Sequence, residues 1–252
     1  MKGDGLESEY GVPFPGRVAP PGQWSHTGYR DDGKPFDWER VFGRSGPRVV
    51  DLGCGNGRYL IGSALSRPDR DHLGIDLVQR AIDFAAHRAN KRGLANVRFV
   101  TGDAVPWLFA RLTGNSVDEI HVYHPQPYYE AAEISRRMLT PDFLERAWQV
   151  LRPNGLLVLQ TDNKAYWKYL LEGARRHFDP EIIPGPWPDA RQGRTRREIL
   201  ARKKGLVVWR MEAHRRDAPV AVAISPPDFD ANRPRFRRGS GAEMGRKKGG
   251  GR

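Results

Sequence analysis

The stretch VVDLGCGNGRYL, residues 49–60, decides the fold expected of this chain. A β-branched apolar run ends on Asp51 and meets three closely spaced glycines, Gly53, Gly55 and Gly57, before the sequence turns helical. Glycine lacks a Cβ atom, so the chain can turn sharply here and bring backbone N–H groups close to a ligand at a helix N-terminus. The pattern predicts the first strand-to-helix turn of a nucleotide-binding α/β domain.

The spacing of these glycines separates the loop from two other nucleotide-binding loops. A dinucleotide fingerprint, GxGxxG, would require a third glycine at position 58, where the chain has Arg58, and the GK[ST] ending of a P-loop is absent. GxGxG preceded by an acid resembles motif I of the class I S-adenosylmethionine-dependent methyltransferases. The resemblance implies that the loop, Asn56 included, binds this cofactor. An ordinary strand-to-helix turn without a ligand is the alternative.

Two further acids follow at the intervals of a repeating βα unit. HLGID reads as a second strand ending at Asp76, roughly 20 residues after the loop, where such an acid binds ribose hydroxyls. VRFVTGDA, residues 97–104, reads as a third strand, and its Asp103 could accept a hydrogen bond from an adenine amino group or merely cap a helix. Open α/β sheets bind ligands at the carboxyl ends of their strands. The residues expected around the cofactor are Asp51, Gly53, Gly55, Asn56, Gly57, Asp76, Leu77, Asp103 and Ala104.

Composition agrees with one soluble enzyme domain. The chain has 252 residues and 38% hydrophobic content, and it has no apolar run near the ~18 residues of a membrane span. The N-terminus, MKGDGLESEY, lacks the basic and apolar regions of a secretory signal. The single cysteine, Cys54, excludes an internal disulfide and fits a reducing cytoplasm; we interpret it as a small turn residue rather than a catalytic thiol. No His and Cys cluster has metal-ligand spacing, so no metal is expected.

The charge of the chain indicates an acidic partner. The formal net charge is +12 and the pI is about 10.1, which favours nucleic acid. Eight basic residues and one acid lie in residues 233–252, a glycine-rich segment with almost no apolar side chains. Such a segment cannot bury enough surface to order itself. We expect a disordered basic tail over 231–252, acting either as an RNA-binding arm or as a solubilising terminus without a partner.

The rest of the chain alternates strands and helices between a Pro- and Gly-rich extension at 1–37 and the tail, which predicts a catalytic domain over 38–230. The extension is expected to wrap the surface or stay loose. Apolar periodicity and turn residues then predict the elements in order. They are a helix over 78–89 closed by Gly93, a strand over 117–123, a helix from Pro141 capped by Thr140, a turn at 152–155 with a strand over 156–161, a helix capped by Asp162 or Asn163, a helix over 195–204 and a strand over 206–213.

The order of these motifs resembles the bacterial tRNA (guanine-N7)-methyltransferases from about Asp37 to Ala213. QTD at 160–162, followed by Thr195 and Glu198 in a TxxE pattern, is the more selective half of the resemblance. The family implies a Rossmann-like class I fold, α/β, with a central, mostly parallel seven-stranded sheet and helices on both faces. It also implies S-adenosyl-L-methionine as cofactor and N7 of a guanosine in tRNA as methyl acceptor. The matching segments are FDWERVFGRSGPRVVDLGCGNG, LGIDLVQRAI, NVRFVTGDA, FLERAWQVLRPNGLLVLQTDNKAYWKYLL and TRREILARKKG.

The resemblance also implies residues that address the target guanosine. Asp162, Thr195 and Glu198 match family positions at which carboxylates could accept hydrogen bonds from the guanine N1–H and amino group. Each residue has a structural alternative. Asp162 and Thr195 could cap helices, and Glu198 could pair with Arg194 or Arg202.

The loop after the strand over 117–123 departs from the family. Where the family has Asp-Pro-Trp-Pro-Lys and then several basic residues, this chain has HPQPYYEAAEISRR, residues 124–137. His124 takes the place of the acid and Tyr128 that of the lysine. Glu130 and Glu133 stand where positive charge is usual, which weakens attraction for a tRNA backbone.

Catalysis remains compatible with this loop, because N7 of guanine carries its lone pair already and needs no general base. Positioning and electrostatics therefore dominate. A neutral His124 is expected to act as the catalytic residue by orienting the substrate, and Tyr128 and Tyr129 could stack on an exposed base or pack on the N-terminal segment.

Three functions follow from these observations. The first is tRNA guanine methylation, the second is methylation of another RNA or a small amine, and the third is RNA binding by a catalytically weakened relative. The expected partner is tRNA or another RNA, with no membrane. We expect a monomer and leave a homodimer open.

Overall fold

The computed structural model describes residues 7–128, residue 133 and residues 136–222. The basic tail expected at 231–252 therefore lies outside the described residues, as do Tyr129 and Glu130 of the loop at 124–137. Within the described ranges, none of the helices combines the length and hydropathy that crossing a membrane requires.

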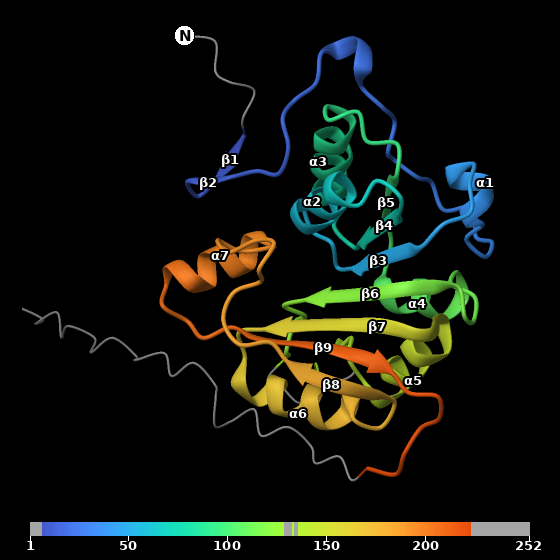
Figure 1. Ribbon diagram of the computed structural model, residues 1–252, viewed down its shortest axis with the longest axis vertical. Helices are drawn as coiled ribbons and strands as arrows, with labels where there is room; N and C mark the ends of the chain where they lie inside the picture. The colour runs from blue at the N-terminus through green and yellow to red at the C-terminus, as the bar shows by residue number, and fades with distance from the viewer. Residues whose placement is uncertain (1–6, 129–132, 134–135, 223–252) are drawn as a thin grey trace, which may run out of the picture.

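A seven-stranded sheet forms the centre of the structure (Figure 1). Its strands are β3 (Arg48–Leu52), β4 (Asp71–Asp76), β5 (Val97–Thr101), β6 (Val117–Tyr123), β7 (Leu151–Thr161), β8 (Phe178–Ile182) and β9 (Trp209–Arg215). Their order across the sheet is β5-β4-β3-β6-β7-β9-β8. Neighbours from β5 to β7 are parallel, whereas β9 is antiparallel to β7 and β8. The mostly parallel seven-stranded sheet is thus confirmed.

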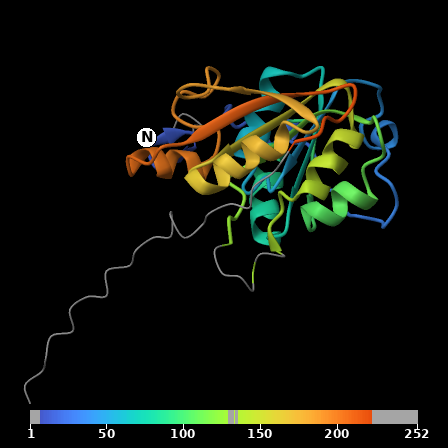
Figure 2. The ribbon, with the colours of Figure 1, turned by 90° about the horizontal axis from the view of Figure 1, so that it is seen from below.

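Helices cover both faces of this sheet because successive strand residues point to opposite sides. On β6, Ile120 and Val122 pack into one apolar core with α4 (Ala104–Ala110), α5 (Pro141–Val150) and α6 (Lys164–Ala174). Figure 2 shows these three helices, green to yellow, on one side of the strands. Tyr123 packs into the other core with α2 (Arg58–Ser66) and α3 (Gln79–Asn90). The carboxyl ends of the parallel strands are left open for a site.

The N-terminal segment wraps α2 and α3. It contains the short hairpin β1 (Ser8–Glu9) and β2 (Val12–Pro13) and the 3-10 helix η1 (Pro21–Gln23), and α1 (Trp38–Phe42) follows it. Phe14 is fully buried, with the guanidinium carbons of Arg58, Arg88 and Arg92 5.4, 4.3 and 4.9 Å from its ring centroid. These cation–π contacts and the salt bridges of Glu9 and Glu7 to the same arginines anchor the hairpin.

Several elements differ from the sequence prediction. The third strand ends at Thr101 because Asp103 caps α4, which the periodicity did not reveal. The expected turn at 152–155 is absorbed into β7, with Asn154 at φ 61° and a register shift against β6. Strand β8 was not predicted, since FDPEI contains Pro180; as an edge strand it tolerates the missing N–H.

Candidate cofactor and substrate site

A cavity of about 630 Å3 lies at the carboxyl ends of β3 and β6, between α3 and α7 (Arg196–Lys203). Asp51 and the glycine loop line it from the sheet, together with Tyr123 at the end of β6. Val78 and Phe84 line it from the α3 side, and Thr195 begins the opposite wall. Segments far apart in the sequence, 51–56 and 195–200, therefore meet in one concave site.

The glycine loop exposes its backbone to this cavity at two positions. Gly53 and Gly55 have φ angles of 83° and 54°, and a Cβ atom built on either would meet nothing within 4 Å. Gly57 differs, because its Cβ would come within about 3.0 Å of Ala85 and Phe99. Gly53 and Gly55 thus let a ligand approach the main chain, whereas Gly57 permits close packing between α2, α3 and β5.

Three N–H groups of the loop that line the cavity are used within the fold, contrary to the expectation that they face a ligand. The amides of Gly53 and Cys54 donate to the carbonyl of Ile75 at 2.8 and 3.0 Å, and that of Gly55 donates to Asp76 at 2.8 Å. At Gly53, Cys54 and Gly55 the loop therefore offers a close approach to the main chain, and its amides there are already bonded.

Asp51 is the acid of this loop that lacks a partner. Its side chain is buried and lines the cavity, and Oδ1 has no hydrogen-bond partner among the described residues. Burial, and then the negative charge of Asp76, raises the pKa of the Asp51 carboxyl well above its ordinary value. A buried polar atom without a partner is costly, so this oxygen fits a hydrogen-bond donor or cation supplied by a ligand.

Four other predicted cofactor residues lie along the carboxyl edge, outside the cavity lining. Asp76 accepts hydrogen bonds from the amides of Gly55 and Val78 at 2.8 and 2.9 Å, so it joins the loop to the start of α3. Asp103 accepts from the Val105 amide at 3.0 Å and caps α4, the alternative foreseen for it. Leu77 is exposed, and Ala104 is buried at the start of α4.

Asn56 lines the cavity and is held by a residue that the sequence did not single out. Its Nδ2 atom donates to Oε1 of Glu9 at 2.5 Å, and that oxygen also accepts from Arg88 at 2.9 Å. The N-terminal hairpin thereby contacts the glycine loop directly. Nothing in the spacing of the sequence pairs Glu9 with Asn56, because the two residues are 47 positions apart.

His124 and Asp162 lie outside the lining of the cavity and are linked to it through Arg197, which does line it, by a series of hydrogen-bonded side chains. The indole N–H of Trp187 donates to Oε1 of Gln160, whose Nε2 lies 2.7 Å from Nε2 of His124. Nδ1 of His124 lies 3.2 Å from Oδ1 of Asp162, and Oδ2 accepts from Nη2 of Arg197 at 2.7 Å. An indole can only donate, so the Gln160 amide donates to His124, and the imidazole carries its proton on Nδ1.

These hydrogen bonds change what His124 can do. Both ring nitrogens are bonded within the protein, so the imidazole holds Asp162 instead of pointing an N–H at a substrate. Burial alone would raise the pKa of Asp162, but hydrogen bonds from His124 and the charge of Arg197 lower it to about 2. Asp162 is therefore an anion at neutral pH, fixed from two sides, and Asn163 caps α6 in its place.

The two predicted residues of α7 have different positions. Thr195 lines the cavity and also caps the helix by accepting from the Glu198 amide at 3.1 Å. Glu198 is fully buried; one oxygen accepts from the backbone N–H of Arg194 at 2.8 Å, and the other pairs with Arg210 of β9. The structure therefore assigns Glu198 to the support of α7, because its carboxylate is already committed.

Tyr128 lies outside the lining of the cavity. Its backbone has φ 41°, the Arg136 guanidinium carbon is 4.8 Å from its ring centroid, and Arg137 donates to its carbonyl oxygen at 2.7 Å. Two arginines of the divergent loop thus hold its backbone and ring, and no contact with the N-terminal segment is seen among the residues described.

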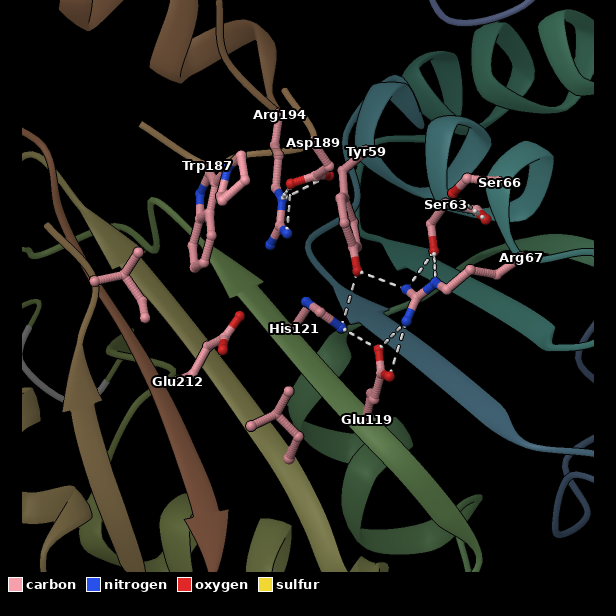
Figure 3. Close-up of a pocket in the computed structure, with 13 residues that line it drawn as sticks. Tyr59, Ser63, Ser66, Arg67, Glu119, His121, Trp187, Asp189, Arg194 and Glu212 are labelled. Carbon is pink, nitrogen blue, oxygen red and sulfur yellow. Dashed lines mark hydrogen bonds and ion pairs between the residues drawn. The ribbon is translucent and has the colours of Figure 1, made fainter. Parts of the chain in front are cut away.

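A second cavity, of about 410 Å3, lies between α2 and the loop at 183–194, with Glu119 and His121 of β6 in its lining (Figure 3). Figure 3 shows the guanidinium of Arg194 between the rings of Trp187 and Tyr59, 3.8 and 5.3 Å from their centroids. Its Nη1 donates to the Tyr123 hydroxyl at 3.1 Å, and Nη2 bonds Asp189 at 2.7 Å. Because Arg194 directly precedes Thr195, these contacts anchor the start of α7 to β6 and α2.

A buried network continues from Tyr123 into this second cavity. The Tyr123 hydroxyl lies 3.0 Å from Nδ1 of His121, whose Nε2 lies 3.1 Å from Glu119 and 2.9 Å from the Tyr59 hydroxyl. Burial lowers the pKa of His121 to about 4, although Glu119 opposes the shift. Arg67 donates to both Glu119 oxygens at 2.8 Å. Sequence reasoning missed this network, because its members alternate with core residues on β6.

Among the described residues, no three His, Cys, Asp or Glu side chains are grouped so that they could hold a metal ion. Cys54 is buried in the glycine loop, and burial raises the pKa of its thiol well above the ordinary value, so the thiolate is disfavoured.

Comparisons with known proteins were made for sequence and for fold. A family described as "Putative methyltransferase" matches residues 45–211. The tRNA (guanine-N(7)-)-methyltransferase of Actinobacillus pleuropneumoniae serotype 5b is 31% identical over 193 residues, covering 74% of this chain and 76% of the relative. The protein of the same name from Alkalilimnicola ehrlichii is 30% identical over 190 residues, covering 74% and 80%. The crystal structure of the 16S rRNA methyltransferase KamB covers 79% of this chain and 95% of its own, with a TM-score of 0.53 and 16% identity, a likeness of fold.

Proposed function

The chain belongs to the tRNA (guanine-N7)-methyltransferase family, and from that premise we propose that it transfers a methyl group from S-adenosyl-L-methionine to N7 of a guanosine in tRNA. One observation carries the proposal. The glycine loop after β3 and the start of α7, which are far apart in the sequence, line one cavity. The methyl donor and the acceptor base can therefore meet there.

The residues of the loop fit the cofactor. The unpartnered Oδ1 of Asp51 suits the ammonium group of its methionyl part, and the open faces of Gly53 and Gly55 leave room for its chain. Each oxygen of Asp76 has a lone pair beyond its amide bond, which suits a ribose hydroxyl. When bound, S-adenosylmethionine supplies an electrophilic methyl group on a positively charged sulfur.

Methyl transfer to N7 then depends on how the substrates are positioned and on the charges around them. The N7 lone pair forms the new C–N bond while the C–S bond breaks and its electron pair stays on sulfur, so no proton is removed from the nucleophile. The base gains positive charge in this step. Asp162, an anion held by His124 and by Arg197 of the cavity wall, is proposed to stabilise that charge.

The partner class follows from charge as well. Helix α7 has the sequence RREILARK, and its exposed Arg196 and Arg197 border the cavity. Exposed arginines beside a cleft favour a phosphate backbone. We propose tRNA as this partner and the cytoplasm as the compartment.

A transfer assay tests the proposal. Purified full-length protein is incubated with methyl-labelled S-adenosylmethionine and bulk tRNA from a strain that lacks N7-methylguanosine, and the product nucleosides are separated. Label in N7-methylguanosine is the expected result. Cofactor binding without transfer to tRNA would overturn it, and label in another nucleoside or in a small amine would assign a different acceptor.

A matched pair of variants tests the role proposed for Asp162. Asp162→Asn removes the negative charge but keeps the size of the side chain, so transfer should fall while cofactor affinity stays within about twofold. Asp142, an exposed acid in the first turn of α5, supplies the control Asp142→Asn, which should leave transfer unchanged.

A further inference from the structure

An apolar patch lies exposed at the α3 side of the cavity. Phe84 is 50% exposed and Val78 56%, and both line the cavity; Leu77, next to Val78, is 71% exposed. Single exposed apolar residues are ordinary, but a group of them at the rim of a site marks a surface that binds something.

The N-terminal hairpin leaves this patch uncovered. One turn further along α3, Arg88 is bonded to Glu9 and faces the buried Phe14; just beyond the end of the helix, Arg92 pairs with Glu7 and also faces Phe14. Phe84 lies on α3 between the hairpin and the cavity, and the hairpin does not cover it. The patch therefore has a defined boundary on the helix.

Basic side chains border the patch on two sides, and the exposed Asp83 beside Phe84 accepts a hydrogen bond from Gln79. The guanidinium carbon of Arg80 lies 5.6 Å from the ring centroid of Phe84, and Arg80 has no hydrogen-bond or ion-pair partner among the residues described. Arg196 and Arg197 line the facing wall on α7, whereas Asp51 is the one acid among the described residues that line the cavity. A ligand of this rim should combine a flat apolar surface with negative charge.

A nucleotide has that combination. We propose that Phe84 forms a stacking site for a nucleobase next to the target guanosine, and that Arg80 binds the phosphate of the same nucleotide. The proposal rests on the RNA substrate of the proposed function and names a contact that it does not contain. Aromatic rings stack on any base, since every base has a π-face, while arginine neutralises the backbone. An acidic peptide with an aromatic side chain would use the same groups, and in that case Phe84→Ala would bind tRNA as tightly as the wild type.

Binding of an unmodified tRNA transcript to full-length variants tests the stacking site. Phe84→Ala should raise the Kd for tRNA about 5- to 100-fold, the usual effect of losing one stacked base. The matched control is Phe109→Ala, because Phe109 is 45% exposed on α4 and does not line the cavity. The control should bind tRNA as the wild type does, and neither variant should change the Kd for S-adenosylmethionine by more than about twofold.

A fluorescence signal reports the contact itself. In F84W, addition of the tRNA transcript or of a single-stranded RNA hexamer should quench the added indole emission, measured as the difference from wild type, and F109W should show no quenching. Equal tRNA affinities of Phe84→Ala and wild type, or no quenching in F84W, would overturn the stacking site. So would a loss of cofactor affinity in Phe84→Ala with unchanged tRNA affinity, which would assign Phe84 to the cofactor.

The proposed function is judged separately from the same preparations. If RNA binds to the wild type and quenches the emission of F84W, but the wild type transfers no methyl group, the stacking site stands and the methyltransferase proposal falls. If the wild type methylates tRNA and F84W is silent, the reverse holds.

Discussion

The Nδ1 atom of His124 lies 3.2 Å from Oδ1 of Asp162, and this contact joins the divergent loop after β6 to the QTD segment at the end of β7. The residue that replaces the acid usual in the family is thus bonded to a second acid of the same site. Because Gln160 occupies the other ring nitrogen, His124 acts on Asp162 rather than on the substrate.

Replacing His124 therefore tests positioning. His124→Ala removes one hydrogen bond to a charged group, worth about 1.5–3 kcal/mol, so kcat for methyl transfer should fall about 10- to 100-fold with the Kd for the cofactor unchanged. His124→Asn keeps an N–H donor and should lose less. Equal losses in both variants would mean that the donor to Asp162 is not what matters.

Asp51 offers a substitution with opposite effects on binding and stability. Asp51→Asn keeps the shape but removes a buried carboxyl that lacks a partner for Oδ1. The free energy of unfolding should stay the same or rise by up to about 2 kcal/mol, because desolvation of the acid is relieved. Calorimetric titration should show affinity for S-adenosylmethionine reduced about 10- to 100-fold, since the cationic group loses its charged partner. Lower stability with unchanged affinity would make Asp51 a structural acid.

The buried pair of Glu198 and Arg210 should be essential to the wall that α7 forms. Glu198→Ala leaves the Arg210 charge buried without its partner and frees the Arg194 amide, so chemical denaturation should report a loss of about 3–5 kcal/mol. Thr195→Ala, which removes only the helix cap, should cost about 0.5–2 kcal/mol. A loss of activity in Glu198→Ala with full stability would instead return Glu198 to the substrate.

Acid should destabilise the protein through His121. Its pKa in the folded state is lowered from 6.5 to about 4, mainly by burial, so the unfolded chain binds more protons between these values. This contribution is complete above pH 6.5 and is lost as the pH falls to about 4, by about 3 kcal/mol. His72 is buried and its pKa is lowered to about 3, so it adds a change of the same sign.

Urea denaturation at pH 7 and pH 4.5 measures this effect. His121→Gln should lower the stability at pH 7, since the contacts to Tyr123 and Glu119 change, but it should reduce the difference between the two pH values. An undiminished difference in the variant would assign the acid sensitivity to other groups.

Much of the fold could be read from local patterns. The turn at Gly53 and Gly55, the N-cap at Thr140 and the strand over 117–123 depend on neighbouring residues, and all three were found as expected. The same reasoning missed β8, since Pro180 is accommodated there at the edge of the sheet, and the edge is defined by the other strands.

The candidate site divides in the same way. The acids at strand ends were located by periodicity, because residues at the carboxyl ends of parallel strands share one edge of the sheet. Which of them keeps a free oxygen was decided by packing, since Asp76 is bonded to two amides whereas Oδ1 of Asp51 is left without a partner. The contacts of His124 with Gln160 and of Glu198 with Arg210 join separate elements, and no spacing along the chain announces them. Residue types and intervals thus specify most of the elements, the glycine loop and the family. Only the folded chain specifies which charges are paired, because hydrogen bonds and ion pairs act over a few ångströms of space, whatever the distance along the sequence.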